Sequence, residues 1–332
     1  MINTEKLISL FKIKFGEFPE KITHLKEHSS DRRIFRLISR NHQAIGIANE
    51  NIKENKAFIN FTYSFFKKGF RVPEIYSKSK DNKYYLLQDL GDITLHQKIS
   101  SKNTKQAENI ALFKKSIDKL VEFQITAPKI LDFKYCFQTK EFNKELISTD
   151  LKKFEEFYFN VFCIKKNKRF LDYTKNILLN LTEYTSKRFF MYRDFQPRNI
   201  MIYRKKLFFI DYQTGRYGPP EYDLASFLYS GSIKLTEKER TELIKYYINK
   251  FKSYFPEIES RMQINFYYFV LLRLLQVLGS YGYVYSRKSD KEILKKIPKA
   301  LRNLRSILSN IENRKVYKFV ENIVKNYKRK KL

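Results

Sequence analysis

The sequence changes its pattern once, near residue 91, and this change limits the possible folds more than any other feature. Before this point, five runs of alternating or continuous apolar residues are bounded by short polar turns, which is the pattern of β-strands. They are residues 21–28, 33–39, 43–49, 72–77 and 83–91. Residues 51–69 instead repeat apolar positions at helical spacing and end in Gly69. After residue 93 the helical spacing dominates. We therefore predict an α+β fold with a small β-rich N-lobe over residues 1–91 and a large, mainly helical C-lobe over residues 92–332.

One β-like segment interrupts the helical part. The runs "NIMI" (199–202) and "LFFI" (207–210), joined by "YRKK", predict a buried antiparallel hairpin. If residues 200–202 pair with residues 208–210, Asn199 and Asp211 lie opposite each other at the base of the hairpin, with Cβ atoms about 5 Å apart. Asp194 lies on the loop just before the hairpin. An amide oxygen and two carboxylates are therefore expected to converge.

This set of side chains, without His or Cys, suits a hard cation. Mg²⁺ in particular takes one or two protein ligands together with substrate phosphates, which predicts phosphoryl transfer. Asn199 and Asp211 would then hold the metal, and Asp194 would orient the acceptor hydroxyl and accept its proton. The flanking Arg193 and Arg198 favour an ionised Asp194. A purely structural alternative is that Asp211 ends a strand and Asn199 caps the hairpin.

Three motifs in this region resemble one family. The stretch "YRDFQPRN" (192–199) resembles the catalytic loop H-x-D-x-x-x-x-N of the aminoglycoside phosphotransferase-like branch of the protein-kinase-like fold, with Tyr192 in place of His. "FIDYQ" resembles its metal-binding segment, and "GPPEYDLAS" its G-P-x-x-Y-D-L-A run. Within the branch, "SSDRRIFRL", "QDLGD" and "LLRLLQVLGSYG" look most like kinases that phosphorylate the anomeric hydroxyl of N-acetylmuramate and N-acetylglucosamine in cell-wall sugar recycling. The resemblance extends from about residue 20 to residue 304.

The resemblance implies an ATP- and Mg²⁺-dependent sugar kinase. Asp194 would be the catalytic residue, and Arg193, Gln196 and Arg198 of the same loop would contact the substrate. Asp223 would support the catalytic loop through hydrogen bonds, although it could also be the N-cap of the helix over "LASFLY". Aminoglycosides and amino-alcohols such as choline are the alternative acceptors, but sites for cationic acceptors need acidic linings, and no acidic cluster follows residue 93.

The N-lobe carries the candidate nucleotide site. "SSDRR" takes the place of the kinase glycine-rich loop, so phosphate contacts would come from Ser30, Arg32 and Arg33. Backbone groups from Gln88 to Leu90, in "LLQDLG", would meet the adenine edge between the lobes.

The third strand, "AIGIAN", lacks the lysine with which protein kinases grip the nucleotide phosphates, although Glu54 stands where their helix glutamate would. Because Arg36 shares a strand face with Ile34 and lies deep in the strand, we predict that Arg36 pairs with Glu54 and reaches the phosphates. Ordinary exposed strand charges are the alternative for these arginines. If no side chain replaces the lysine, the protein would be a pseudokinase.

The composition limits the classes of molecule that the protein is expected to bind. With 66 Lys and Arg against 35 Asp and Glu, the formal net charge is +31, which fits either a polyanionic partner or a compositional bias that scatters Lys along the chain. No nucleic-acid-reading module accompanies the charge, so nucleic acid is an unlikely partner, and a nucleic-acid-binding or regulatory pseudokinase is the rival of another class. No pattern indicates an oligomeric state.

The remaining features predict a cytoplasmic protein. The apolar stretch over residues 265–279 is too short and too polar to span a bilayer, and the N-terminus has the lysines of an amphipathic helix and not a secretory signal. The two cysteines form no CxxC motif or disulfide framework, which suits a reducing compartment. A small-molecule sugar is therefore the expected partner.

Overall fold

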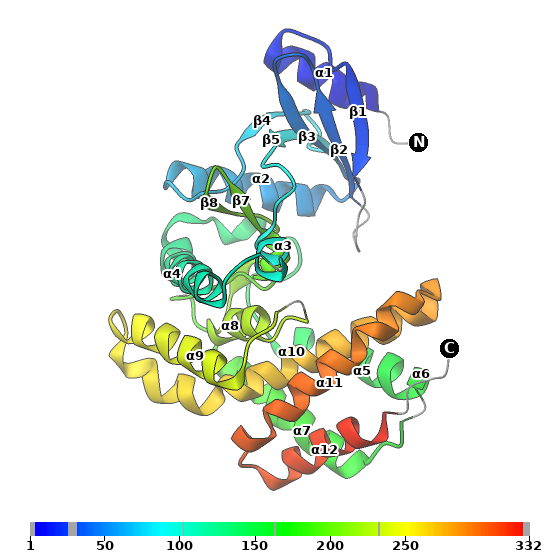
Figure 1. The fold of residues 1–332 in the computed structure, drawn as a ribbon, viewed down its shortest axis with the longest axis vertical. Helices are drawn as coiled ribbons and strands as arrows, with labels where there is room; N and C mark the ends of the chain where they lie inside the picture. Colours follow the sequence, from blue (N-terminus) through cyan, green and yellow to red (C-terminus); the bar gives the residue numbers. More distant parts are fainter. Residues whose placement is uncertain (1–3, 26–31, 102, 163, 232, 328–332) are drawn as a thin grey trace. The chain divides into compact units, whose positions relative to one another are not determined.

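The structure is a computed structural model that describes residues 4–25, 32–101, 103–162, 164–231 and 233–327. Two compact units make up the chain (Figure 1). The first consists of Met1–Ser101, Thr126–Lys140 and Tyr192–Arg216, and the second of Lys102–Ile125, Glu141–Met191 and Tyr217–Leu332. The first unit therefore contains the predicted N-lobe together with the catalytic-loop motif. The lobe boundary at residue 91 stays a prediction.

A five-stranded antiparallel sheet forms the centre of the first unit, in the strand order β1-β2-β3-β5-β4. All five predicted strands are present: β1 (Lys21–Leu25), β2 (Arg33–Ile38), β3 (Gln43–Ala48), β4 (Ile75–Lys78) and β5 (Tyr84–Gln88). Helix α1 (Thr4–Phe15) packs its apolar side on the sheet, where Leu7 and Phe11 join Leu37 and Leu86 in one core. Burial of this face fixes which side chains of β2 and β3 face the core and which face away from it.

Helix α2 (Ile52–Lys67) has well-defined ends that set the position of Glu54. The Asn51 side chain accepts a hydrogen bond from the Glu54 backbone N–H and so caps the helix at its start. Gly69 follows the last turn with φ of +89°, as predicted for a residue that ends a helix in the left-handed region. Glu54 is thereby held in the first turn of α2.

The predicted hairpin is present as β7 (Ile200–Tyr203) and β8 (Lys206–Phe209). Its register differs by one residue from the predicted one, because Ile200 pairs with Phe209 and not with Ile210. The turn explains the difference. Arg204 and Lys205 both have positive φ and form a two-residue turn, so Tyr203 and Lys206 pair with each other, whereas the prediction treated "YRKK" as a four-residue connection. Asn199 therefore faces Ile210 across the ladder, with the Ile210 N–H donating to the Asn199 carbonyl at 3.1 Å.

Shorter elements complete the first unit, and one long helix runs from the second unit into it. The shorter elements are α3 (Leu95–Ser100), η1 (Phe133–Tyr135) and η4 (Pro197–Asn199). The long helix is α4 (Gln106–Ile130). The two-residue strands β6 (Phe190–Met191) and β9 (Arg216–Tyr217) lie at the ends of the catalytic-loop segment.

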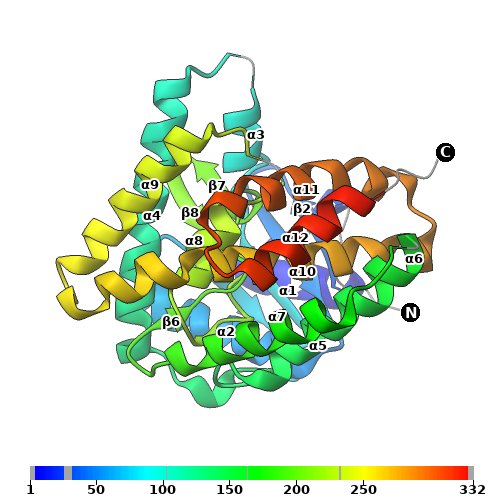
Figure 2. The same cartoon turned by 90° about the horizontal axis from the view of Figure 1, so that it is seen from below.

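The second unit is helical (Figure 2). Its elements are α5 (Lys144–Phe154), the π-helical turn η2 (Glu155–Phe159), α6 (Asn160–Phe162), α7 (Lys168–Asn180), η3 (Leu181–Tyr184), α8 (Glu221–Leu228), α9 (Glu237–Lys252), η5 (Pro256–Ile258), α10 (Glu259–Lys288), η6 (Lys291–Lys295), α11 (Ile297–Ser306), η7 (Leu308–Asn310) and α12 (Arg314–Asn326). The predicted apolar stretch lies inside α10, which packs against α5, α8 and α11. Gly282 permits close packing against η2, since a Cβ atom there would lie 2.2 Å from the Phe157 carbonyl oxygen.

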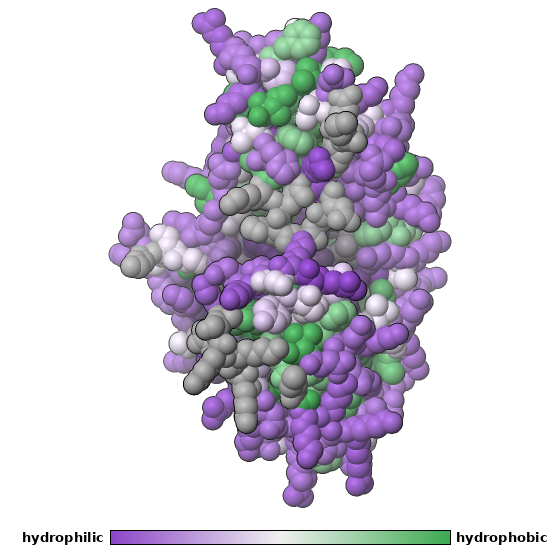
Figure 3. Space-filling view, turned by 90° about the vertical axis from the view of Figure 1, so that its right-hand side faces the viewer, coloured by the Kyte–Doolittle hydropathy of each residue, from purple (hydrophilic) through white to green (hydrophobic). Residues whose placement is uncertain are grey.

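The surface is largely hydrophilic on the face shown in Figure 3, and hydrophobic residues form small separate patches on it. Among the described helices, none combines the length and the apolar composition that a bilayer crossing requires.

Candidate active site

The catalytic-loop motif is held by Tyr192, the residue that replaces the family's histidine. Tyr192 is fully buried, and its hydroxyl donates to the Ile210 carbonyl oxygen at 2.7 Å. This bond ties the start of the loop to the end of the hairpin, one residue before Asp211. The tyrosine at this position therefore acts as a buried hydrogen-bond donor that holds the loop against the hairpin.

Asn199 and Asp211 meet as predicted, although the register around them is different. The Asn199 amide donates to the Asp194 backbone carbonyl at 2.9 Å and to Asp211 Oδ2 at 3.0 Å. Both amide hydrogens are thereby in use, so only the Asn199 Oδ1 oxygen is left to act as a ligand. Asp211 has φ of +70°, a left-handed conformation that Asp and Asn tolerate better than most residues.

The carboxylate of Asp194 is half-buried. Its Oδ2 accepts a hydrogen bond from the Thr214 hydroxyl at 3.3 Å, and its Oδ1 accepts one from the Gln196 amide at 3.5 Å. Of the other predicted substrate residues, Arg193 donates to the Gln138 side chain at 2.8 Å, and Arg198 is exposed. Their roles in substrate binding stay predictions.

Asp211 and three side chains beside it form a cluster that we call the Arg32 cluster: Arg32, Glu54, Asp211 and Gln213. Arg32 Nη2 donates to Asp211 Oδ1 at 2.9 Å, and Arg32 Nε lies 3.6 Å from Glu54 Oε1. The Gln213 amide reaches the same two oxygens, at 2.8 Å and 3.4 Å. Burial works against the charged form of Asp211, but the Arg32 charge and the hydrogen bonds from Gln213 and Arg32 outweigh it and hold the pKa of this carboxyl below its ordinary value.

The predicted pair between Arg36 and Glu54 is wrong. Arg36 instead binds Asp89 with two hydrogen bonds, at 2.6 Å and 3.1 Å, and also binds Asp92, at 2.8 Å and 3.2 Å. The face of the strand was predicted correctly, since Arg36 and Ile34 line one cavity. Arg36 lies too far along β2 to reach Glu54, and the acidic residues of "QDLGD" are closer, so Arg32 on the same face pairs with Glu54.

The contact between Arg36 and Asp89 carries a stability prediction. Only 1% of the Asp89 side chain is exposed, so Arg36→Ala would leave a buried carboxylate without its guanidinium. We expect the free energy of unfolding in urea to fall by about 2–3 kcal/mol. The exposed Arg40 in the turn after β2 offers the matched control, and an Arg40→Ala protein that unfolds at the same urea concentration as Arg36→Ala would contradict the expectation.

A cavity of about 550 Å³ in the first unit is lined by part of these groups, whereas Asp194, Glu54 and Gln213 are not among its described lining residues. Apolar side chains of β2, β3 and β5, among them Ile34, Ile47 and Leu87, form part of its wall. The predicted site residues that line it are Arg32, Arg36, Gln88, Leu90, Arg198, Asn199 and Asp211. Arg33 is exposed at the start of β2 and is not among the described lining residues, and Ser30 lies outside the described residues.

The oxygen-rich end of this cavity fits a divalent cation. Asn199 Oδ1 and the Asp211 carboxylate are hard ligands, and the buried Gln213 Oε1 beside them has no hydrogen-bond partner among the described residues. Within the described part of the chain, no group of three or more His, Cys, Asp or Glu side chains is placed to hold a metal ion. A cation here would therefore complete its coordination with water and substrate oxygens, as Mg²⁺ commonly does.

In the second unit, Asp223 is completely buried in α8 and accepts a hydrogen bond from the Gln124 amide at 2.9 Å. The helix already begins at Glu221, so the alternative that Asp223 is an N-cap is wrong. Its predicted support of the catalytic loop stays a prediction.

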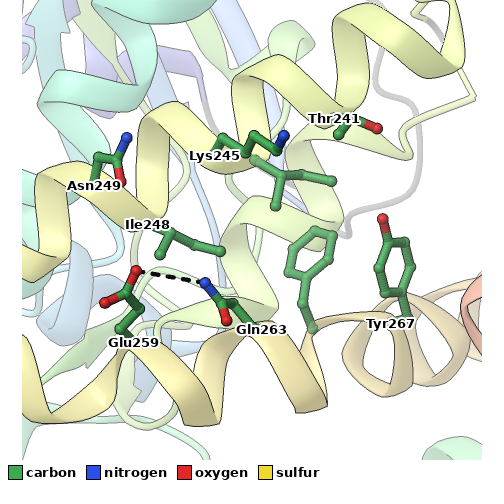
Figure 4. A pocket seen from close by; sticks show the side chains of 9 residues that line it. Thr241, Lys245, Ile248, Asn249, Glu259, Gln263 and Tyr267 are labelled. Atoms are coloured by element: carbon green, nitrogen blue, oxygen red, sulfur yellow. Dashed lines mark hydrogen bonds between the residues drawn. The ribbon is translucent and has the colours of Figure 1, made fainter.

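A second cavity, of about 380 Å³, lies between α9 and α10 (Figure 4). Its side chains include Lys245, Ile248, Glu259 and Gln263, the last two joined by a hydrogen bond of 3.5 Å. None of the predicted site residues lines this cavity. The cavity of the first unit is therefore the candidate active site.

Comparison with known families decides the class of this site. Residues 57–259 match the model of the phosphotransferase enzyme family, abbreviated APH. The chain belongs to this family. The predicted family resemblance and the predicted enzyme class are thereby confirmed, and the protein is a phosphotransferase of the kinase type.

Individual relatives of this phosphotransferase agree with the family. The chain is 26% identical, over 246 residues, to the N-acetylmuramate/N-acetylglucosamine kinase of Neisseria meningitidis, covering 71% of this chain and 70% of the relative. The solved choline kinase LicA from Streptococcus pneumoniae has a TM-score of 0.59 at 14% identity, over 92% of this chain and all of that one. The ADP-bound aminoglycoside phosphotransferase APH(2'')-Ib has a TM-score of 0.55 at 16% identity, over 89% of this chain and 97% of that one. These structures confirm the predicted kinase-like fold.

Sequence reasoning missed two residues of the site, Gln213 and Thr214. A usable signal was present, because the strand pairing that brings Asp211 to the base of the hairpin must also bring the polar residues directly after it. Gln213 reaches Asp211, and Thr214 reaches Asp194.

Proposed function

We propose that this phosphotransferase transfers the γ-phosphate of ATP to the anomeric hydroxyl of an N-acetylated sugar, either N-acetylmuramate or N-acetylglucosamine. The observation that carries the chemistry is the Asn199 amide, which joins the backbone of Asp194 to the Asp211 carboxylate within hydrogen-bond distance. The choice of acceptor is supported by the sugar kinase to which the chain is 26% identical.

In the proposed reaction Asp194 accepts a proton. The sugar hydroxyl oxygen attacks the γ-phosphorus, the bond from that phosphorus to the bridging oxygen breaks, and ADP leaves. The hydroxyl proton passes to the Asp194 carboxylate, which is half-buried in the catalytic loop. Asn199 and Asp211 would hold Mg²⁺, which when bound neutralises charge on the phosphates.

The cavity supplies the nucleotide site in this proposal. Its apolar wall would sandwich the adenine ring, and the backbone from Gln88 to Leu90 would meet the adenine edge. Arg32 and Arg198 line the same cavity and would contact phosphates. The solved APH(2'')-Ib structure, which has the same fold, is ADP-bound, and this supports the use of a nucleotide.

A panel of acceptors tests the proposal. The protein is incubated with γ-labelled ATP, Mg²⁺ and each of N-acetylmuramate, N-acetylglucosamine, an aminoglycoside and choline, with Asp194→Asn as the blank. We expect label in a sugar and loss of that sugar's reducing end, because phosphorylation of the anomeric oxygen blocks ring opening. Label in choline or the aminoglycoside alone would overturn the acceptor, and label in a sugar that stays reducing would move the reaction to another hydroxyl.

The nucleic-acid-binding pseudokinase is tested in the same preparation. It requires DNA or RNA binding with a steep salt dependence that survives Asp194→Asn, together with no label in any acceptor. We expect the opposite pattern, because Arg32 supplies a cation beside Glu54 that the third strand lacks.

A further inference from the structure

Arg32 and Gln213 make the same pair of contacts. Each donates to Asp211 Oδ1, at 2.9 Å and 2.8 Å, and each lies near Glu54 Oε1, at 3.6 Å and 3.4 Å. Two carboxylates therefore share one guanidinium and one amide. Less than a fifth of the side chain is exposed in both Arg32 and Glu54, so solvent screens this arrangement only weakly.

The position of Arg32 in the sheet explains why it and not another cation makes these contacts. Strand β3 contributes only Gln43, small or aliphatic residues and no lysine. Arg32 directly precedes β2, on the face that also presents Ile34 and Arg36 to the cavity. Since Arg36 is held by Asp89 and Asp92, Arg32 is the arginine of this face that reaches the oxygen-rich end of the cavity.

Arg32 and a divalent cation require the same carboxylate. Asp211 accepts hydrogen bonds from Arg32 and Gln213 on Oδ1 and from Asn199 on Oδ2, which occupies three of its roughly four lone-pair positions. A cation on Asp211 would also stand beside the guanidinium, and like charges in a partly buried site repel each other. The contact from Arg32 to Glu54, at 3.6 Å, is longer than the 2.9 Å bond from Arg32 to Asp211, so Asp211 is the carboxylate that Arg32 holds more closely.

We propose that Arg32 exchanges Asp211 for the nucleotide phosphates, and that it thereby replaces the lysine of the third strand and couples nucleotide binding to metal binding. Phosphate oxygens offer the guanidinium a bidentate partner, while Glu54 orients it. The exchange releases Asp211 for the cation. This inference rests on the proposed function, because it takes a nucleotide as the ligand of the cavity.

The test measures metal and nucleotide binding separately, without an acceptor. Mn²⁺ is titrated into nucleotide-free protein and followed by electron paramagnetic resonance, and ADP is titrated in the presence of EDTA by calorimetry. We expect Arg32→Gln to bind Mn²⁺ about tenfold more tightly than the wild type, because the competing contact is gone, and to bind ADP about tenfold more weakly. Asp211→Asn should remove the gain in Mn²⁺ affinity when combined with Arg32→Gln.

Two further variants keep the test decisive. Arg40→Gln removes the same charge from an exposed turn, and we expect it to leave both affinities unchanged. Arg32→Lys retains a cation but not the planar fork, and we expect ADP binding near the wild-type level with Mn²⁺ affinity between those of the wild type and Arg32→Gln. Thermal unfolding verifies that each variant folds, and Arg32→Lys carries the test if Arg32→Gln does not.

The outcomes separate this inference from the proposed function. Equal Mn²⁺ affinity in the wild type and in both Arg32 variants, or ADP affinity unaffected by Arg32→Gln, would overturn the role of Arg32 even if sugars are phosphorylated. If the titrations behave as expected and no acceptor is labelled, the exchange at Arg32 stands and the assignment as a sugar kinase falls.

Discussion

Replacing Asp211 with asparagine is expected to abolish turnover and to leave the fold intact. The substitution removes a charged ligand of the proposed metal, which should cost several kcal/mol of transition-state stabilisation. The backbone should tolerate it, because asparagine adopts the φ of +70° found at this position at least as readily as aspartate. Steady-state phosphorylation of the identified sugar gives kcat, and circular dichroism with thermal unfolding verifies the fold.

The structure also suggests how the stability of Asp211→Asn should behave. Arg32 keeps Glu54 as a partner, but the asparagine has one oxygen where Asp211 uses two, so its amide group would face one of the donors from Arg32, Gln213 or Asn199. The unfolding temperature should therefore fall modestly in a variant that still folds. More than about a tenth of the wild-type kcat in a folded variant would remove Asp211 from the list of metal ligands.

The second large effect is expected at Asp194. Asp194→Asn preserves the shape of the side chain, and its single amide oxygen can still accept one of the two bonds from Thr214 and Gln196, but the substitution removes the group that accepts the proton. We expect kcat to fall by about 10²-fold or more while the affinity for ATP hardly changes. Single-turnover kinetics together with calorimetric ATP binding measure the two quantities independently.

A reversed result at Asp194 would assign the residue differently. If ATP affinity fell and kcat held, Asp194 would be a nucleotide or metal residue and not the proton acceptor. Gln196→Ala is a useful companion, because its 3.5 Å contact with Asp194 is too long to matter much for the orientation of the carboxylate, and a loss of activity there would point to the predicted substrate contact.

Much of the first unit was predictable from local patterns. The five strands of the sheet and helix α2 have distinct apolar periods and clear ends, and Gly69 marks where α2 must stop. The hairpin was predictable as an element, but its register was not, since one residue more or less in the turn changes every pair. Positive φ at both Arg204 and Lys205, two residues not usual in such turns, decided the register.

The candidate site was predictable where its residues are close in sequence. Asp194, Asn199 and Asp211 lie within one loop and one hairpin, so local geometry brings them together whichever register the strands adopt. Arg32, just before β2, and Arg36, within it, were harder to assign, because their partners lie on other elements. Alternation identified the face they share, but the distance along the strand that separates Arg32 from Arg36 decided which of them meets Glu54.

The order of apolar periods along the chain was enough to predict a β-rich part followed by a helical part, and the spacing of Asp194, Asn199 and Asp211 was enough to predict phosphoryl transfer, because secondary structure and short-range geometry depend on neighbouring residues. The kinase-like fold was predicted from the resemblance of the motifs to a known family, which the comparisons confirm. The partners of the charged side chains were decided only by the tertiary structure. The two arginines belong to β2 and the residue before it, whereas Glu54 lies in α2 and Asp89 follows β5, and a charge pairs with the opposite charge that packing brings nearest. No local pattern contains that distance, so the Arg32 cluster, with Asp211 and Gln213, could be found only in the folded molecule.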